Sequence, residues 1–326
     1  MTEQAHTLSF RLWWGLLGCV VLMIAILLAG PYGDHIAFLP DSGAAWYFWQ
    51  RPDPTVVSRL SAWLSYAAHQ LSIWWLIFLA QRRGLGYVTG MHPINLAALL
   101  INGLFVVWHI VQTRWFYDGL AQDVSIFTSF GSVAILLMLV VIMENQRRGV
   151  LFGKRWNWLD QPGRFLRKYH GYYFSWAVIY TFWYHPIEMS LGHLLGTFYT
   201  IMLMLQGSLF FTRAHVNRNW TVLLEVFVLV HGATVAWLAL DNQSWAMFAF
   251  GFGSIFIITQ MHGLGWSRAL RWLVAAVFLA AWFLSYYPAL GFGVVDALRI
   301  PLIYVISVPL LALVVTAISR SRKHRE

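Results

Sequence analysis

The chain has 326 residues, of which 59% are hydrophobic and only 11% are charged. Soluble domains carry roughly 25% charged residues, so this composition excludes an ordinary soluble domain and predicts an integral membrane protein. The single cysteine, Cys19, excludes an internal disulfide and any metal site built from several thiolates.

Ten apolar segments follow one another along the chain, and each is close to the ~20 residues that span the ~30 Å hydrocarbon core of a bilayer. They predict an all-α fold: a polytopic integral membrane helical bundle of about ten transmembrane helices, forming a single transmembrane domain over residues 1–326. The first segment is interpreted as a retained helix, because no small-residue cleavage site clearly follows it. The segments are 12–30, 60–80, 94–116, 124–143, 171–188, 191–212, 221–240, 244–264, 270–288 and 300–319.

The basic residues are distributed unevenly between these segments. If the N-terminus is cytoplasmic, most of the 22 lysines and arginines fall on the inner side, as the positive-inside rule requires. Both termini are then cytoplasmic, and the expected location is a membrane of the bacterial inner-membrane type. The net charge of +9 is therefore a topology signal, which indicates anionic lipid headgroups at the inner face as partners and no nucleic acid. The exceptions on the outer side are Arg51, Arg59, Arg114 and Arg299.

Two connections between the apolar segments are long enough to hold structure. The outer loop 31–58 is rich in Pro, Gly, Asp and aromatic residues, and a short interfacial helix is expected around Trp46–Trp49. The inner loop 145–169 mixes basic and aromatic residues, which favours anchoring in the headgroup layer or, as an alternative, docking of a soluble partner or an anionic lipid substrate. Aromatic residues at the span ends are expected to form interfacial belts; they include Trp115, Tyr117, Trp183 and Tyr184.

Histidines inside the apolar segments are the strongest pointer to function. An ionisable group in hydrocarbon is costly, so it usually faces a protein interior or a watery cavity and has a partner there. His69, His109 and His231 lie at similar depth, roughly 12–15 Å from the outer ends of their helices at ~1.5 Å per residue. They are therefore candidate cofactor-binding residues, provided that their helices are neighbours. Gln112 shares a helical face with His109 and is expected to orient its imidazole.

The densest polar motif of the chain runs from Trp183 through His185, Pro186 and Glu188 and is followed by His193. If the helix continues through Pro186, His185 and Glu188 share one face, at a spacing used by carboxylate-bridged metal sites. Pro186 can instead end the helix and expose carbonyl groups near His185. Imidazole and carboxylate together suit zinc or iron. Glu188 and His185 are the candidate catalytic residues, and the candidate metal ligands are His109, His185, Glu188, His193 and His231.

The inner half of the predicted bundle has its own polar residues. Glu225 is expected to form a structural ion pair with Arg218 or His262. A sharper interpretation is a path for protons or electrons between the two faces, because chains of His and Glu mark such paths. His92 and His170 lie at inner helix starts and belong to the same set.

Three functions are compatible with these residues. The favoured hypothesis is an intramembrane metal-dependent enzyme, an oxidoreductase or hydrolase, in which zinc, iron or copper near the outer face activates water or oxygen on a lipid-like substrate. The alternative is a haem b-binding electron-transfer protein, with outer ligands from His69, His109 and His231 and inner ones from His92, His170 and His262. A second alternative is a proton- or metal-coupled transporter.

Overall fold

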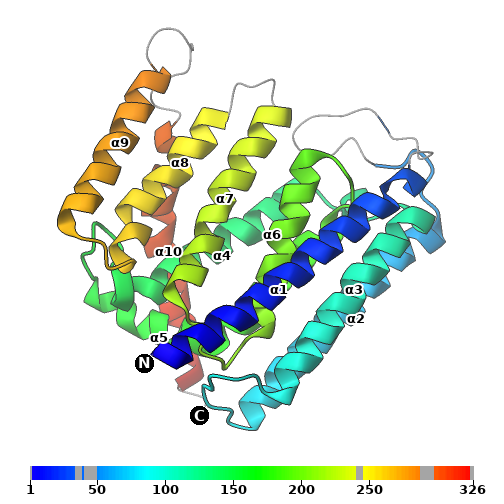
Figure 1. The fold of residues 1–326 in the computed structure, drawn as a ribbon, viewed down its shortest axis with the longest axis horizontal. Helices are drawn as coiled ribbons and strands as arrows, with labels where there is room; N and C mark the ends of the chain where they lie inside the picture. Colours follow the sequence, from blue (N-terminus) through cyan, green and yellow to red (C-terminus); the bar gives the residue numbers. More distant parts are fainter. Residues whose placement is uncertain (1, 34–38, 40–49, 240–244, 287–296, 324–326) are drawn as a thin grey trace. The chain divides into compact units, whose positions relative to one another are not determined.

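The computed structural model describes residues 2–33, 39, 50–239, 245–286 and 297–323, and the expected helix around Trp46–Trp49 lies outside these ranges. Within them the chain is all-helical: ten α-helices, short 3₁₀ turns and isolated bridges only (Figure 1). Each of the ten predicted apolar segments overlaps one of these helices. By length and composition, seven described helices can cross a membrane. They are α1, α3, α4, α7, α8 with the turn after it, α9 and α10.

The chain divides into two compact units, and both are discontinuous in sequence. The first unit comprises residues 1–134 and 171–217, and the second comprises 135–170 and 218–326. Two helices pass from one unit to the other along their length: α4 (Ile126–Arg148) and α5 (Asp160–Tyr184).

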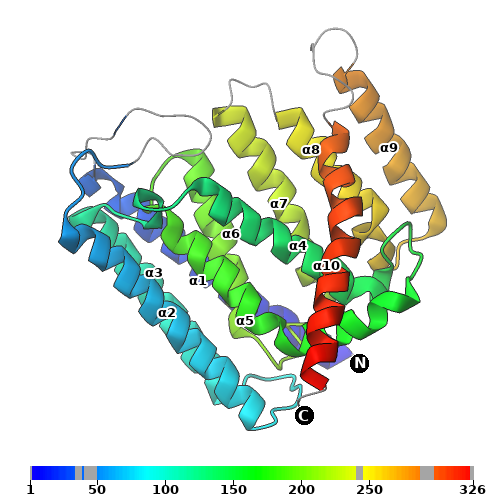
Figure 2. The ribbon, with the colours of Figure 1, turned by 180° about the vertical axis from the view of Figure 1, so that it is seen from behind.

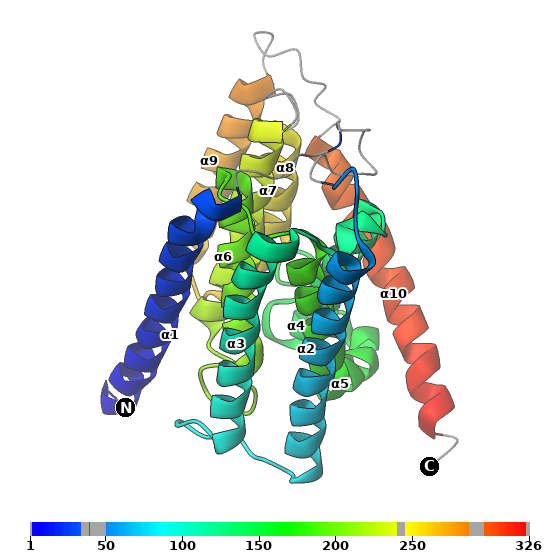
Figure 3. The same ribbon diagram turned by 90° about the vertical axis from the view of Figure 1, so that its right-hand side faces the viewer.

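The first unit is organised around an adjacent pair of helices, α2 and α3, whose side-by-side course is plain in Figures 1 and 3. Thr55 and Ser58 form a capping box at the start of α2, and Pro93 occupies the first turn of α3, where its missing N–H costs no hydrogen bond. Helix α6 packs against α3, and α1 packs along both. The bounds are Thr2–Ala29 for α1, Val56–Arg82 for α2, Pro93–Phe116 for α3 and Leu191–Ser208 for α6.

The second unit centres on α8, which packs against α7, α9 and α10 (Figure 2). Close approach of α8 to its neighbours requires small residues: a Cβ on Gly251 would lie 2.7 Å from Ile300 of α10, and one on Gly253 would lie 2.6 Å from Phe278 of α9. Phe250 and Tyr286 belong to the buried core at this junction. The bounds are Arg218–Ala239 for α7, Trp245–Ile258 for α8, Arg268–Tyr286 for α9 and Arg299–Lys323 for α10.

Helices α2, α5 and α6 are too polar or too short to count among the seven apolar helices. Helix α2 buries His69 and Gln70, and α6 buries Thr197, Thr200 and Ser208. Their polar residues face the interior of the first unit, where buried polar groups must find partners. The same property that lowers their hydropathy therefore builds the candidate site.

Candidate functional site

His69 is fully buried on α2 and has a different kind of partner at each ring nitrogen. The Trp183 indole N–H donates to Nδ1 over 3.2 Å, and Nε2 lies 2.8 Å from the Asn102 Oδ1. Because an indole can only donate, Nδ1 must accept and Nε2 carries the proton that is donated to Asn102. The Asn102 amide in turn donates to Ser208 Oγ over 2.8 Å. A neutral imidazole in one fixed tautomer therefore satisfies every partner of His69.

His109 is equally buried on α3, yet both of its nitrogens face acceptors. Nδ1 lies 2.9 Å from the Gln112 Oε1, which confirms that Gln112 orients this ring, and Nε2 lies 3.1 Å from the carbonyl oxygen of His185. The Gln112 amide orientation is fixed because its Nε2 donates to Ser61 Oγ and to the Asp118 carbonyl, each over 3.0 Å. A neutral imidazole has one N–H and can satisfy only one of two acceptors, whereas an imidazolium satisfies both.

The second acceptor comes from an irregular segment, residues 185–190, between α5 and α6. Helix α5 ends at Tyr184, so it does not continue through Pro186, and His185 and Glu188 do not share a helical face. The proline ring removes a donor and clashes with the preceding turn, which frees carbonyl groups for other partners. The Ile187 carbonyl accepts from Arg114 Nη2 over 2.8 Å, and its N–H donates to Thr113 Oγ1 over 3.1 Å.

Glu188 is held by Tyr117, whose hydroxyl donates to the carboxylate. Burial, reinforced by the Glu188 carboxylate, raises the pKa of Tyr117 above its ordinary value, so the phenol keeps its proton. Tyr117 ends α3 in the left-handed region at φ 42°, a conformation that costs energy for a residue with a side chain. Two hydrogen bonds hold Tyr117 in this conformation: one from its hydroxyl to Glu188 and one from its backbone N–H to the Thr113 carbonyl.

The turn after α3 approaches the end of α5 closely. A Cβ on Gly119 would lie 2.8 Å from the carbonyl oxygen of Tyr184 and 3.0 Å from Cα of His185, so only glycine fits without a backbone shift. Beside it, burial raises the pKa of Asp118 to about 6, against the lowering effect of hydrogen bonds from Ser58 and the Gly119 N–H. This close approach fixes the position of the His185 carbonyl over His109.

The remaining histidines expected at the outer face form a smaller contact. The rings of His185 and His193 lie edge to face with centroids 5.0 Å apart. His193 Nδ1 is 2.6 Å from Ser190 Oγ, and His185 Nδ1 is 3.1 Å from the Pro186 carbonyl. In the part of the chain that the structure describes, no group of three or more His, Cys, Asp or Glu side chains is arranged to hold a metal ion.

Two of the expected groupings involve the second unit. His231 lies half-buried on α7 of that unit, so its expected convergence with His69 and His109 stays a prediction. The expected pairing of Glu225 with Arg218 or His262 is wrong: Glu225 binds the buried Arg148 of α4 over 2.7 Å and accepts from Gln260 over 3.1 Å.

The histidines of the expected inner set have individual partners. His92 Nε2 lies 3.0 Å from the carbonyl of Gly86. His170 Nδ1 lies 3.0 Å from the carbonyl of Arg167, in its own helix. The Arg271 guanidinium lies 3.0 Å from Nδ1 of His262. These contacts are typical of helix-end pairing.

Several residues of the site have a different role from the one expected. Their position at span ends predicts interfacial belts for Trp183, Tyr117 and Tyr184, but the exposed fractions of these side chains are 0%, 1% and 1%. Trp115, which is 73% exposed, fits the belt. Asn102 is not among the residues predicted from the sequence, although a lone amide in the apolar run of α3 is itself a signal of a buried polar partner.

Comparison of the chain with models of protein families, with curated proteins and with solved structures found no match.

Proposed function

We propose that this protein is a proton-coupled membrane transporter, with ten membrane helices and both termini in the cytoplasm, in which His109 is the proton-binding residue. The observation that carries the proposal is the pair of acceptors around this imidazole, the Gln112 amide oxygen and the His185 carbonyl. Buried ionisable residues that face a protein interior are the usual proton sites of transporters.

The proton on His109 acts on the segment between α5 and α6. With the proton bound, both N–H groups are satisfied and the His185 carbonyl is held against α3. When the proton leaves, one nitrogen lone pair faces a carbonyl oxygen, and the repulsion favours release of one of the two contacts. Proton binding therefore biases two positions of residues 185–190, which is what a coupled binding step requires.

Three further features support transport. Backbone carbonyls outside regular helix are typical of ion sites in transporters, and residues 185–190, which connect α5 to α6, direct the His185 and Ile187 carbonyls to His109 and Arg114. Gln70 is buried on α2 with neither side-chain amide atom hydrogen-bonded, and a polar substrate or water would satisfy it. The division of the chain into two compact units suits a mechanism in which one part moves against another.

The metal-enzyme and haem hypotheses have less support from the same contacts. Ligation of a metal or haem iron by His69 or His109 requires a free nitrogen lone pair. All four nitrogens of these two rings are within hydrogen-bond distance of protein partners. Glu188, the expected catalytic carboxylate, is bonded to Tyr117. Either ligand would have to break this network, whereas a proton completes it.

The experiment is a proton-flux assay in proteoliposomes with a pH-sensitive dye in the lumen and an imposed inside-negative potential. We expect proton entry above that of protein-free liposomes, lost on His109→Gln. His69→Gln is the matched control, since it removes a histidine of equal burial that binds no proton, and it should retain the flux. Equal flux in wild type and His109→Gln, or equal loss in both variants, would overturn the proposal.

A further inference from the structure

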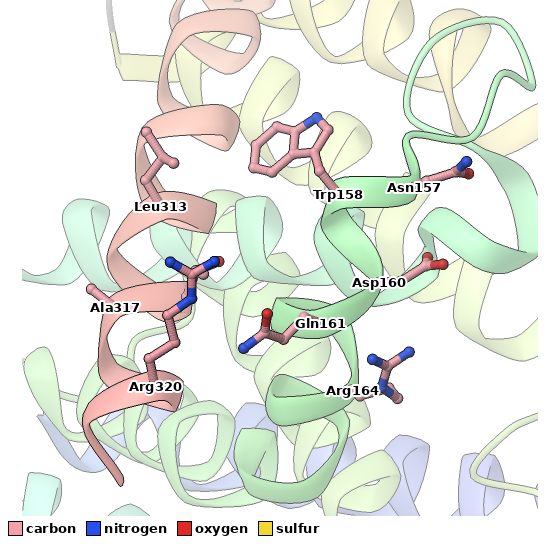
Figure 4. A pocket seen from close by; sticks show the side chains of 9 residues that line it. Asn157, Trp158, Asp160, Gln161, Arg164, Leu313, Ala317 and Arg320 are labelled. Atoms are coloured by element: carbon pink, nitrogen blue, oxygen red, sulfur yellow. The ribbon is translucent and has the colours of Figure 1, made fainter. Parts of the chain in front are cut away.

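A pocket of about 600 Å³ lies in the second unit, between the last turns of α10 and the start of α5 (Figure 4). Trp158 and Gln161 line one wall, and Leu313, Thr316 and Arg320 of α10 line the other. Its volume is in the range of small-ligand sites, roughly 300–1,000 Å³. The residues that meet here come from segments about 150 positions apart in sequence, so the pocket is a product of the fold.

The pocket carries positive charge. Arg164 and Arg320 both line it, and each guanidinium presents donors in a planar fork that matches the oxygens of a phosphate. The one acidic lining residue, Asp160, accepts from the Asn145 amide over 3.4 Å, and Figure 4 shows its carboxylate directed away from α10. The lining as a whole carries two arginines against one aspartate, a net charge of +1.

The two walls are linked by side chains. Gln161 Nε2 donates to Ser319 Oγ over 3.2 Å, and Ser319 is itself bonded to the Thr316 carbonyl over 2.9 Å. These bonds join the first turn of α5 to the end of α10. The arginines are thus presented from a framework that exists before a ligand arrives.

The outer flank of the pocket is apolar and exposed. Leu310, Leu313 and Val314 of α10 are each more than half exposed, in a helix that is long and apolar enough to cross a membrane. Trp158, 45% exposed, supplies the kind of indole that sits at the headgroup level. A ligand with a phosphate at one end and hydrocarbon at the other would satisfy both parts of this surface.

We infer that this pocket binds an anionic phospholipid, with its phosphate between Arg164 and Arg320 and an acyl chain along α10. A free phosphate would use the arginines but leave the exposed apolar flank uncovered. The inference concerns the second unit alone and does not rest on proton coupling at His109.

The test is lipid retention by the purified full-length protein, measured by native mass spectrometry in detergent during titration with phosphatidylglycerol. We expect one tightly held lipid, bound at least about tenfold more weakly, or about 1.4 kcal/mol, by Arg164→Gln/Arg320→Gln. The control is Arg82→Gln/Arg83→Gln, which removes the same charge from exposed residues at the end of α2 and should retain the lipid. All four arginines are exposed surface residues. Each variant is therefore expected to keep the wild-type unfolding temperature when no lipid is bound.

Two further titrations distinguish an anionic phospholipid from a soluble phosphate as the ligand. Phosphatidylcholine, which is neutral, and millimolar inorganic phosphate should not displace the bound lipid. Equal weakening of lipid binding in the control variant would show that general charge attraction, and not the pocket, holds the lipid. That result would overturn the inference. Full displacement by inorganic phosphate would overturn it in favour of a soluble phosphorylated ligand.

Discussion

His69 and His109 are both buried in the first unit and both contact Trp183, yet their hydrogen-bond partners differ in kind. His69 has one donor and one acceptor as partners, Trp183 and Asn102, whereas His109 has two acceptors. Under the proposed function, burial alone does not distinguish a structural histidine from a proton-binding one. The donor or acceptor character of the partners does, because a neutral imidazole can complete only the first arrangement.

A buried polar group of the second unit, Arg148, has a third kind of environment. Arg148 is fully buried, and its charge is met by the opposite charge of Glu225 at 2.7 Å. Such a pair repays the cost of desolvating two ions only while both partners are present. The three environments thus form a series: one donor and one acceptor at a neutral ring, two acceptors at a second ring, and a pair of opposite charges.

The largest effect is expected at the charged end of this series. Glu225→Leu leaves the Arg148 cation buried without its partner and should lower the free energy of unfolding by about 3–5 kcal/mol. The double variant Arg148→Met/Glu225→Leu removes both charges and should be more stable than the single one. Unfolding in detergent provides the measurement, and a double variant at least as unstable as Glu225→Leu would contradict this account.

Substitutions at the neutral end of the series should cost less. Asn102→Leu removes the acceptor of the His69 Nε2–H and should destabilise the protein by about 1–3 kcal/mol, the cost of an unsatisfied buried donor. Leu104→Ala, on an exposed part of the same helix, is the control and should change stability by less than about 0.5 kcal/mol. If the two variants unfold at the same temperature, the His69 network does not stabilise the fold.

Trp183→Phe converts the partners of His69 from a donor and an acceptor into an acceptor alone. The loss of one hydrogen bond should cost about 1 kcal/mol, and Nδ1 gains no acceptor to which an added N–H could donate, so the buried ring should stay neutral. Imidazole NMR of the variant should show His69 with its proton still on Nε2 and no additional titrating histidine. A His69 that takes up a second proton near neutral pH would argue against control of the charge state by partner type.

A pH dependence of stability is expected from Asp118. Because burial raises its pKa to about 6 in the folded chain, the folded state holds this proton after an unfolded chain, with a pKa near ~3.9, has lost it. Stability should therefore fall as pH rises from about 4 to about 6 and then level off. Asp118→Asn keeps the acceptor for the Gly119 N–H and should flatten this decline in thermal unfolding curves. The same slope in the variant would assign it to other groups.

The sequence predicts the helices because hydropathy reports directly on length and apolarity, and each of the ten predicted segments overlaps a helix of the described residues. It does not predict the contacts, since a sequence does not say which helices are neighbours: the partner of Glu225 comes from α4 and not from nearby Arg218 or His262. Pro186 left two outcomes open at His185 and Glu188, and the end of α5 at Tyr184 selects one. Trp183 was misassigned because a residue at a helix end can face either lipid or the interior.

The most direct test of the central claim is the charge state of His109. The protein is labelled with ¹⁵N at the histidine rings, its NMR spectrum is recorded near pH 7, where unperturbed histidines are mostly neutral, and the His109 signals are assigned by their loss in His109→Gln. We predict an imidazolium with a proton on each nitrogen. A neutral His109 with a single protonated nitrogen, from pH 7 down through the acid range in which the protein stays folded, would contradict the account.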